Sequence, residues 1–474
     1  MGFISTVKRW FNMFFPALAR DEFGIAAITS PAMIEHIQRW DRIYKGVPDW
    51  VNADDGIKTV NFAKAICSET ARLTMLGAKI SISGSSRADW LMEQINLLYS
   101  KIREWTEYGC NYGTILLKPG DTGVDVYTPE EFIITTVNAG AITGAAFINR
   151  EVDEAEKKWY TRLEYHRFED IGGVQHYVIT NRCFVGNSAN DRGKPIAIEK
   201  TPWVGLAEEV NILGLEHPLF AVFRTPAANN IEIGSALGMS IYAEAIEELR
   251  DLDVAYSRNA EEIGDSKRTV LLDSDRLLPG GVVKGAAARD NVLGLAGSPL
   301  PKYIKLVDGS GAAESDVYHE INPTLNTDTR LSGINALLSQ IGYKVGFSNG
   351  YFVFNEQTGI QTATGVEAEQ QRTIQFIKDV RDMLEKCIDG LVYALDRFAD
   401  LYELAPIGEY EVAYNFGDIT YNQEEDKQTW RGYVTQHIVP AWLYLAKFEG
   451  YTEDEAKAIV AEAQPRETLF GAEE

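Results

Sequence analysis

One continuous stretch, residues 343–402, constrains the fold most, because a glycine- and aromatic-rich loop there leads into a long helical pattern. The loop, residues 346–361, reads GFSNGYFVFNEQTGIQ and places four aromatic side chains among three glycines. Surface loops seldom carry so much aromatic surface unless it is buried at an interface or presented to a ligand. We therefore expect an interface or binding loop. The ordinary alternative is a surface loop ahead of a packed core helix.

The residues after this loop predict one long helix. Thr364 and Glu367 have the spacing of a capping box, which marks a helix start. From Thr364 to Tyr402 the helix would reach roughly 58 Å at about 1.5 Å per residue. Gly390, which costs about 1 kcal/mol relative to Ala, is the expected kink. The apolar residues recur at spacings of three and four, as one helical face requires: Ile377, Val380, Leu384, Ile388, Leu391, Leu395, Phe398 and Tyr402.

Composition limits the classes of partner. The 474 residues are enough for two to four domains, and their formal net charge of −24 argues against tight binding of a phosphate backbone. The four cysteines are scattered, which indicates reduced thiols in a cytosolic compartment. The apolar runs stay well below the roughly 20 residues of a membrane span.

The first residues, MGFISTVKRWFNMFFPALAR, mix apolar and basic side chains. Because Lys8 and Arg9 interrupt the apolar run, we interpret residues 1–24 as an amphipathic arm that docks on a neighbouring subunit or partner, and not as a signal peptide. The same residues also fit the MGxxx[ST] acylation pattern.

In chain order, the remaining patterns predict an α+β fold. Residues 25–125 are mostly helical, and residues 131–200 read as an antiparallel meander. A proline-punctuated connector, 217–230, precedes a helix over 235–263. We interpret the acidic residues on its faces, Asp253 among them, as solvated. An irregular glycine- and alanine-rich module, 280–320, then leads to another helix that ends near Gly342 or Gly346. After Pro406 the patterns predict a strand and then helices, one of them capped by Thr452 and Glu455.

The sequence provides no argument for catalysis. It contains no P-loop, GxSxG elbow or calcium loop, and we expect no enzyme activity, cofactor or metal. Glu164, His166 and Glu169 alternate along a predicted strand. They could form a metal site, but the solvated face of a strand is the interpretation we prefer.

The order of these pieces resembles the portal (head-to-tail connector) proteins of tailed bacteriophages, particularly siphophages of Gram-positive hosts. The resemblance covers roughly residues 35–405. One departure is Gly365, in TATGV, where the family often has Glu. Four segments carry the resemblance: IQRWDRIYKG (37–46), EYGCNYGTILLK (107–118), GSALGMSIYAEAIEELRDLDVAYS (234–257) and GFSNGYFVFNEQTGIQTATGVEAEQQRT (346–373).

The resemblance implies a portal-type α+β architecture with these parts: an N-terminal arm (1–24), an α/β wing (25–232), a stem helix (233–263), a clip (264–320), a second stem helix (321–345), a tunnel loop (346–361), a long kinked wing helix (362–405), and a wing strand with a helical crown (406–474).

The resemblance also implies a ring, usually of twelve subunits, at one vertex of the virion capsid, assembled in the host cytoplasm. Double-stranded DNA would pass through it during packaging and ejection. The implied partners are the terminase large subunit, a head-completion adaptor, and the major capsid and scaffolding proteins, with no membrane. An acidic wall would repel the duplex and let it slide, since each phosphate contact adds affinity.

From this combination of family and composition we expect two sets of site residues. The DNA-channel lining would comprise Lys344, Phe347, Ser348, Asn349, Tyr351, Glu247, Asp251, Glu261 and Glu262. The oligomer interface would comprise Ile377, Leu384, Ile388 and Leu391.

Two alternatives are a different phage head-tail protein, such as a minor head protein or adaptor, and a hydrolase that uses some of the many carboxylates. Adaptors are usually much shorter, and the hydrolase lacks a nucleophile or metal motif.

Overall fold

The structure is a computed structural model. It describes the segments 15–51, 56–120, 123–155, 157–188, 191–265, 269–273, 304–307, 318–321, 326–353, 363–417, 423–436, 438–449 and 451–463. The chain forms two compact units, described separately below: residues 1–74 with 80–413, and residues 75–79 with 414–474. Helices and strands are mixed, and the α+β class is confirmed.

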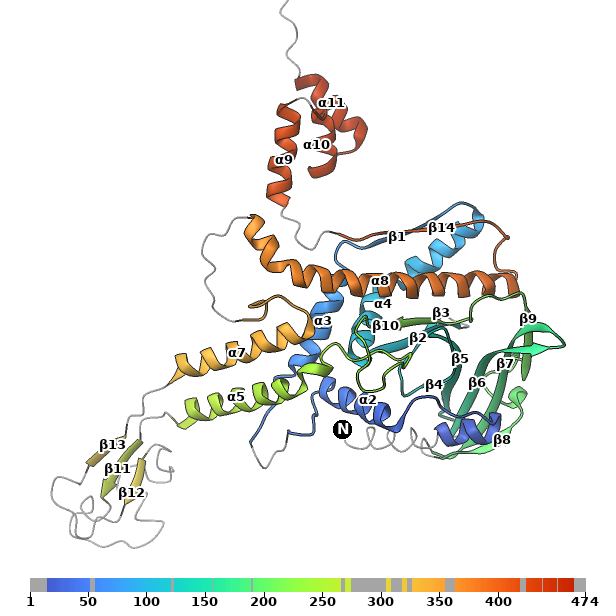
Figure 1. Ribbon diagram of the computed structural model, residues 1–474, viewed down its shortest axis with the longest axis horizontal. Helices are drawn as coiled ribbons and strands as arrows, with labels where there is room; N and C mark the ends of the chain where they lie inside the picture. The colour runs from blue at the N-terminus through green and yellow to red at the C-terminus, as the bar shows by residue number, and fades with distance from the viewer. Residues whose placement is uncertain are drawn as a thin grey trace, which may run out of the picture. The chain divides into compact units, whose positions relative to one another are not determined.

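Helices and a small antiparallel sheet, of order β10-β2-β3, form one part of the larger unit. The sheet comprises β2 (Thr114–Gly120), β3 (Gly123–Tyr127) and β10 (Ala221–Arg224). β10 lies in the predicted 217–230 connector, so that prediction missed a strand. The helices around it are α2 (Pro31–Tyr44), α3 (Phe62–Thr74), α4 (Ser86–Tyr112) and α8 (Ala363–Leu401) (Figure 1).

Helix α8 packs along β10 at a close approach. A Cβ on Gly390 would lie 3.4 Å from the Cβ of Ala221, so this glycine lets the strand lie against the helix. Figure 1 shows a bend in α8 near its amino end, and the kink at Gly390 stays a prediction. Helix α8 begins at Ala363, and the side chains of Thr364 and Glu367 lie outside those that the structure describes, so the capping box there stays a prediction.

A second, larger sheet confirms the predicted meander. Its antiparallel strands are β4 (Phe132–Asn138), β5 (Ala141–Asp153), β6 (Lys158–Ile171), β7 (Val174–Gly186) and β8 (Lys194–Ile196). A short helical turn, η1 (Ile198–Lys200), follows β8, and β9 (Glu209–Leu213) then pairs with β7, which the sequence analysis did not predict.

The sheet is covered by residues from the predicted N-terminal arm. Residues 15–23 are helical, and Phe15, Leu18 and Ala19 join a core cluster with Leu163 and Phe184 of the sheet. These side chains are core residues of this chain, because apolar contacts within the chain bury them. The arm prediction is therefore wrong for residues 15–23, and residues 1–14 lie outside the described segments.

Two helices enclose the predicted clip region in sequence. A short 3-10 turn, η2 (Ala243–Ala245), precedes α5 (Ile246–Asp265), and α7 (Thr327–Val345) follows the region. Between them, β11 (Thr269–Asp273) pairs in parallel with β12 (Ile304–Val307) and antiparallel with β13 (Tyr318–Ile321). The other residues of the region lie outside the described segments.

Helix α5 begins eleven residues later than predicted, because backbone N–H groups of residues 235–242 form tertiary hydrogen bonds in place of helical ones. The N–H of Gly238 donates to the hydroxyl of Thr114 (2.8 Å), and that of Ile241 donates to the carbonyl of Cys110 (3.0 Å). Tertiary hydrogen bonds to the α4–β2 corner thus replace the first turns of the predicted helix.

The described residues of the smaller unit form the helices α9 (Gln423–Thr435), α10 (Ala441–Phe448) and α11 (Glu453–Ala463). At the start of α11, the Thr452 hydroxyl donates to the Glu455 carboxylate (2.8 Å) and accepts from the Glu455 N–H (3.4 Å). This confirms the second predicted capping box. Strands β1 (Lys79–Ser83) and β14 (Glu411–Asn415) form a two-stranded sheet.

Candidate functional site

The two helices that enclose the 266–326 region lie side by side and antiparallel (Figure 1). Near the start of α5, Lys344 forms an ion pair with Glu248 (2.6 Å) and donates to the carbonyl of Glu244 (2.9 Å). Near its end, Glu262 pairs with Arg330 and accepts from the N–H of Asn326 (3.1 Å). Ion pairs at both ends therefore set the register of α5 against α7.

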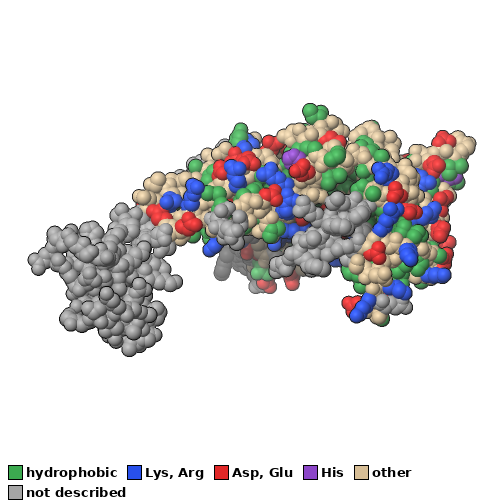
Figure 2. All heavy atoms as spheres, turned by 90° about the horizontal axis from the view of Figure 1, so that it is seen from below, with side chains coloured by type: hydrophobic (Ala, Val, Ile, Leu, Met, Phe, Trp, Pro, Cys, Tyr) green, Lys and Arg blue, Asp and Glu red, His purple; other side chains and the backbone are tan. Residues whose placement is uncertain are grey.

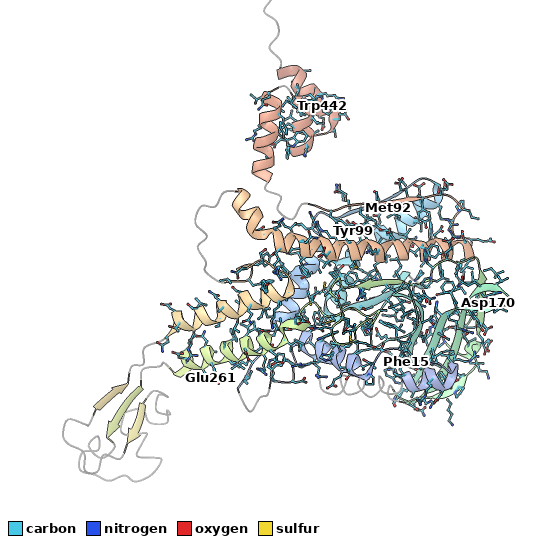
Figure 3. All side chains as sticks on the ribbon, viewed as in Figure 1. Phe15, Met92, Tyr99, Asp170, Glu261 and Trp442 are labelled. Carbon is cyan, nitrogen blue, oxygen red and sulfur yellow. The ribbon has the colours of Figure 1, made fainter. Side chains whose placement is uncertain are left out.

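Helix α5 presents an acidic surface. It carries seven acidic residues against two arginines. Of the predicted channel-lining residues, Glu247, Asp251 and Glu261 are exposed, and Figure 3 shows the side chain of Glu261 at the carboxyl end of the helix. Glu247 pairs with Arg39 (3.4 Å), and Arg250 lies 3.2 Å from Asp251. The surface is acidic but partly neutralised.

Lys344 and Glu262 are only partly available as lining residues. The side chain of Lys344 is 34% exposed and that of Glu262 is 20% exposed, and both are held in the ion pairs described above. On the face drawn in Figure 2, basic and acidic side chains are interspersed.

One acid on α5 is structural. Asp253 is 3% exposed and accepts from the indole N–H of Trp50 (2.8 Å) and the backbone N–H of Val60 (2.8 Å). The buried carboxylate thereby holds two part-buried donors of the segment that leads into α3. The sequence analysis had interpreted it as part of a solvated face, which is wrong for this residue.

The turn after α7 is a packed structure. Gly346, with φ of 115°, ends the helix in the left-handed conformation that glycine favours. The ring of Phe347 then packs against Phe352 (centroids 4.7 Å apart) and Phe376 of α8 (5.5 Å). The aromatic residues of this segment thus form an internal cluster with α8.

Hydrogen bonds fix the same turn to α8 and α3. The backbone N–H of Ser348 donates to the hydroxyl of Thr373 (2.8 Å), and the N–H of Thr373 donates to the hydroxyl of Ser348 (3.2 Å). The hydroxyl of Tyr351 donates to Glu69, which Arg72 also contacts. Burial, followed by the bond to Glu69, raises the pKa of Tyr351 above its ordinary value.

These contacts correct the predicted lining. Phe347 is fully buried and Ser348 is 5% exposed, so neither can face a channel. Tyr351 is half-buried with its hydroxyl engaged, and Asn349 is exposed at the tip of the turn. Residues 354–361 of the predicted tunnel loop lie outside the described segments.

The Ser348–Thr373 pair gives a stability prediction. Thr373→Val keeps the volume but removes the acceptor of the Ser348 N–H, so we expect the free energy of unfolding to fall by about 1–3 kcal/mol. Urea denaturation followed by tryptophan fluorescence measures this. As a control, Thr435→Val changes an exposed threonine and is expected to shift stability by less than about 0.5 kcal/mol. Equal effects at both positions would contradict the assignment.

The predicted interface residues Ile377, Leu384, Ile388 and Leu391 are buried within the chain itself, each at most 4% exposed. The last three line one apolar region with Ile102, Trp105 and Phe223. Their contacts are with α4, β2 and β10 of the same chain, and they leave no surface for another subunit. The prediction is wrong because helical periodicity identifies an apolar face but not its partner.

Sequence reasoning missed a buried ionic cluster that Arg162, Glu164 and His166 of β6 form with Lys118 of β2, which belongs to the smaller sheet. The carboxylate of Glu164 lies 2.6 Å from Lys118 Nζ and 3.2 Å from Arg162 Nη2, and His166 Nε2 lies 2.8 Å from its other oxygen. All four side chains are at least 90% buried. The solvated-face interpretation is therefore wrong for Glu164 and His166, although Glu169 is exposed as expected.

The charges in this cluster follow from the contacts. Burial alone would raise the pKa of Glu164, but Lys118, the hydrogen bond from His166 and Arg162 hold it well below its ordinary value. Burial lowers the pKa of His166 and outweighs the effect of Glu164. His166 is thus neutral, with Nε2–H donating to Glu164 and Nδ1 accepting from the hydroxyl of Tyr177 (2.8 Å).

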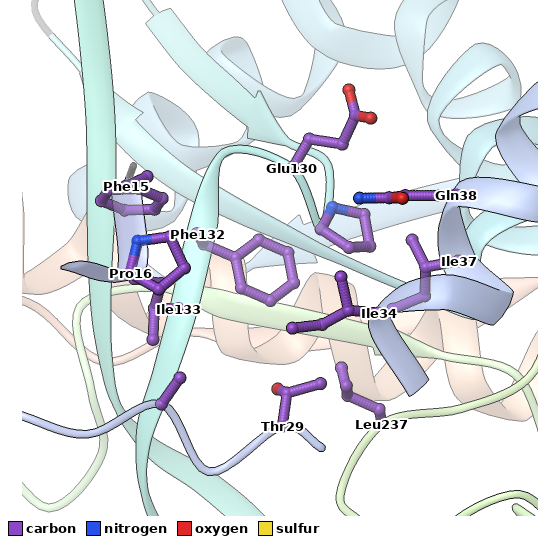
Figure 4. Close-up of a pocket in the computed structure, with 12 residues that line it drawn as sticks. Phe15, Pro16, Thr29, Ile34, Ile37, Gln38, Glu130, Phe132, Ile133 and Leu237 are labelled. Atoms are coloured by element: carbon purple, nitrogen blue, oxygen red, sulfur yellow. The ribbon is translucent and has the colours of Figure 1, made fainter. Parts of the chain in front are cut away.

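A small pocket lies beside Phe15 (Figure 4). It has a volume of about 60 Å³, and its lining includes Ile34, Ile37, Phe132 and Ile133.

Within the described segments, no group of His, Cys, Asp and Glu side chains could hold a metal ion. Among the described helices, none combines the length and apolar character of a membrane span.

The chain has low similarity to two solved structures of gene transfer agent particles. No protein-family model matches the chain, and no curated protein matches it. Among solved structures, a chain of the virion of a native gene transfer agent particle matches with 9% identity and a TM-score of 0.41, over 89% of this chain and 99% of that one. A chain from the neck of an empty gene transfer agent particle matches with 8% identity and a TM-score of 0.41, over 92% and 96%. At these values the likeness does not establish a shared fold or function.

Proposed function

We propose that this chain is a subunit of a portal ring in a tailed-phage virion, through which double-stranded DNA passes. The observation that carries the proposal is the antiparallel pair α5 and α7, tied at both ends by ion pairs and joined through the strands β11, β12 and β13. This corresponds to the stem–clip–stem order that the sequence resemblance implies. The packed turn and α8 follow in the expected order.

The charge of α5 supports a passive channel. Its exposed carboxylates would face a polyanion, and repulsion would keep the duplex from binding to the wall. Under this proposal the protein is not an enzyme. Its partners would be further copies of itself, the terminase large subunit, the head-completion adaptor, and the capsid and scaffolding proteins.

Sedimentation velocity of the purified full-length chain tests ring formation. A head-to-tail contact that closes on itself gives one discrete large species, and one that does not close gives open filaments. We expect a single species whose mass is a multiple of 52.8 kDa. A chain that stays monomeric across concentrations and salt conditions, or forms filaments, would contradict the proposal. It would favour the alternative of a minor head protein.

Charge reversal on α5 tests the repulsive wall. We expect the triple variant Glu247→Lys, Asp251→Lys and Glu261→Lys to retain double-stranded DNA at about 50 mM salt and to release it near about 200 mM, whereas the unchanged chain retains none. Gel-shift assays across a salt series measure this.

The matched control reverses three exposed acids of the meander sheet, Glu169, Asp170 and Glu209 (Asp170 is labelled in Figure 3). It makes the same change in net charge. Equal DNA retention by the two triple variants would show that net charge alone, and not the α5 surface, controls binding.

A further inference from the structure

A large groove in the larger unit is lined by strands of both its sheets. Its volume is about 800 Å³, in the range of cavities that bind ligands. The lining comes from β2 and β3 of the smaller sheet, from β5, β6 and β9 of the meander sheet, from the segment around Trp203 and from the carboxyl end of α8. We call it the inter-sheet groove.

Apolar side chains on the wall of this groove are accessible to solvent. At the carboxyl end of α8, Leu401 is 45% exposed and Tyr402 is 56% exposed. Other apolar lining residues are half-buried: Val126, Ile179, Leu206, Val210, Ile212 and Phe398. Accessible apolar surface that gathers in one concave place marks an interaction site, because water is a poor partner for it.

The accessible charge of the groove is acidic. Asp125 and Glu151 are exposed, against one exposed cation of the lining, Lys101. The half-buried Arg150 interacts with the half-buried Glu131, so these two charges offset each other. The cations of the buried ionic cluster are at most 10% exposed and are held in the ion pairs described above. The groove therefore favours an apolar occupant that carries positive charge.

Residues 1–14 of the chain have the composition of such an occupant. They read MGFISTVKRWFNMF, in which eight side chains are apolar and four of those are aromatic. The charged side chains among them are Lys8 and Arg9, without an acid, in a chain whose formal net charge is −24. So many apolar side chains in a short segment gain free energy when another surface removes them from water.

The position of Phe15, to which this segment is joined, favours the groove of a second copy. Phe15 shares a core cluster with Leu163 of β6, whereas Arg162 and Glu164 of the same strand line the groove. Alternate residues of a strand point to opposite faces of the sheet, so Phe15 lies on the face away from its own groove. The groove of another copy can be reached without passing around the edge of this sheet.

We propose that the inter-sheet groove of one copy binds residues 1–14 of a second copy, with apolar side chains of the segment against Leu401 and Tyr402 and with Lys8 and Arg9 towards the acidic rim. The observation that carries the inference is the accessible apolar wall of an 800 Å³ groove whose exposed charges are mainly acidic. Like the proposed function, it requires that copies associate, but it does not require that they close into a ring.

Photocrosslinking of the full-length chain tests this. The photoreactive amino acid benzoylphenylalanine replaces Trp10, and illumination joins it to the side chains that it contacts. We expect a product with twice the mass of one chain on a denaturing gel, whose crosslink maps by mass spectrometry to residues 203–212 or 394–402. A product of a single chain, a crosslink that maps elsewhere, or no product would overturn the inference. If this product forms but sedimentation shows no closed ring, the portal proposal fails and the inference stands.

Two double variants place the site. Leu401→Gln with Tyr402→Gln is expected to lower the yield of the two-chain product about tenfold, at a chain concentration where the yield follows the affinity. The matched control, Leu213→Gln with Val174→Gln, changes two exposed apolar residues outside the groove lining and is expected to keep the yield. A yield that survives the first pair of changes, or that falls equally with both pairs, would contradict the assignment.

Discussion

Replacing Glu164 with Gln is expected to lower the free energy of unfolding of the larger unit by about 3–5 kcal/mol. The side chain keeps its size but loses the charge that Lys118 and Arg162 share at 2.6 and 3.2 Å. Two buried cations then face each other without an anion between them. Urea denaturation followed by tryptophan fluorescence at neutral pH measures the change.

Glu169→Gln is the matched control on the same strand. Glu169 is 47% exposed in its side chain and pairs with Arg167 at 2.9 Å, and exposed pairs contribute about 0–1 kcal/mol. A loss at Glu164 as small as that at Glu169 would contradict the buried-cluster account.

The effect of Glu164→Gln depends on pH. The pKa of Glu164 is lower in the folded than in the unfolded chain, where its ordinary value is 4.5. The carboxylate therefore stabilises the fold fully above about pH 4.5, and the stabilisation is lost as the pH falls towards its folded pKa. We expect the gap between the unchanged chain and Glu164→Gln to narrow below that pH, as measured by urea denaturation in a pH series.

Gly113→Ala is expected to destabilise the larger unit by about 2–5 kcal/mol. Gly113 ends α4 with φ of 76°, and a side chain costs about 1–2 kcal/mol in this left-handed region. A Cβ there would also lie 2.5 Å from the carbonyl oxygen of Gly238. Because the obstacle is backbone, the corner must shift, which adds about 1–3 kcal/mol. Urea denaturation measures the sum.

Gly172→Ala separates the two contributions. Gly172 has a similar φ of 68°, but a Cβ there would meet nothing within 4 Å. Only the conformational cost of about 1–2 kcal/mol remains. If the two alanine variants lost the same stability, the close approach at Gly113 would contribute nothing and the packing of this corner would be misassigned.

The parts of the fold that the sequence predicted are those with a local signal. The alternating strands of the meander and the capping box at Thr452 and Glu455 depend on short-range spacing. The predicted start of α5 was wrong because residues 235–242 form hydrogen bonds to the α4–β2 corner, more than a hundred residues away in sequence. Strand β10 was missed because its partner β2 also lies more than a hundred residues away in sequence.

The residues of the candidate site also divide into those with a local sequence signal and those whose environment depends on distant contacts. The exposure of Glu247, Asp251 and Glu261 agrees with their positions on an acidic helix. The burial of Phe347 and of the α8 stripe could not be read from the pattern, since an apolar face packs equally well within a chain or between chains. Glu164 and His166 alternate along β6, but only the three-dimensional fold brings Lys118 to the carboxylate.

Cryo-electron microscopy of the assembled full-length protein tests the central proposal most directly. The account predicts a closed ring with an open axial channel whose wall includes α5, with Glu247, Asp251 and Glu261 directed towards the axis. A particle that is solid along its axis, or a channel lined mainly by lysine and arginine with α5 on the outer surface, would contradict it.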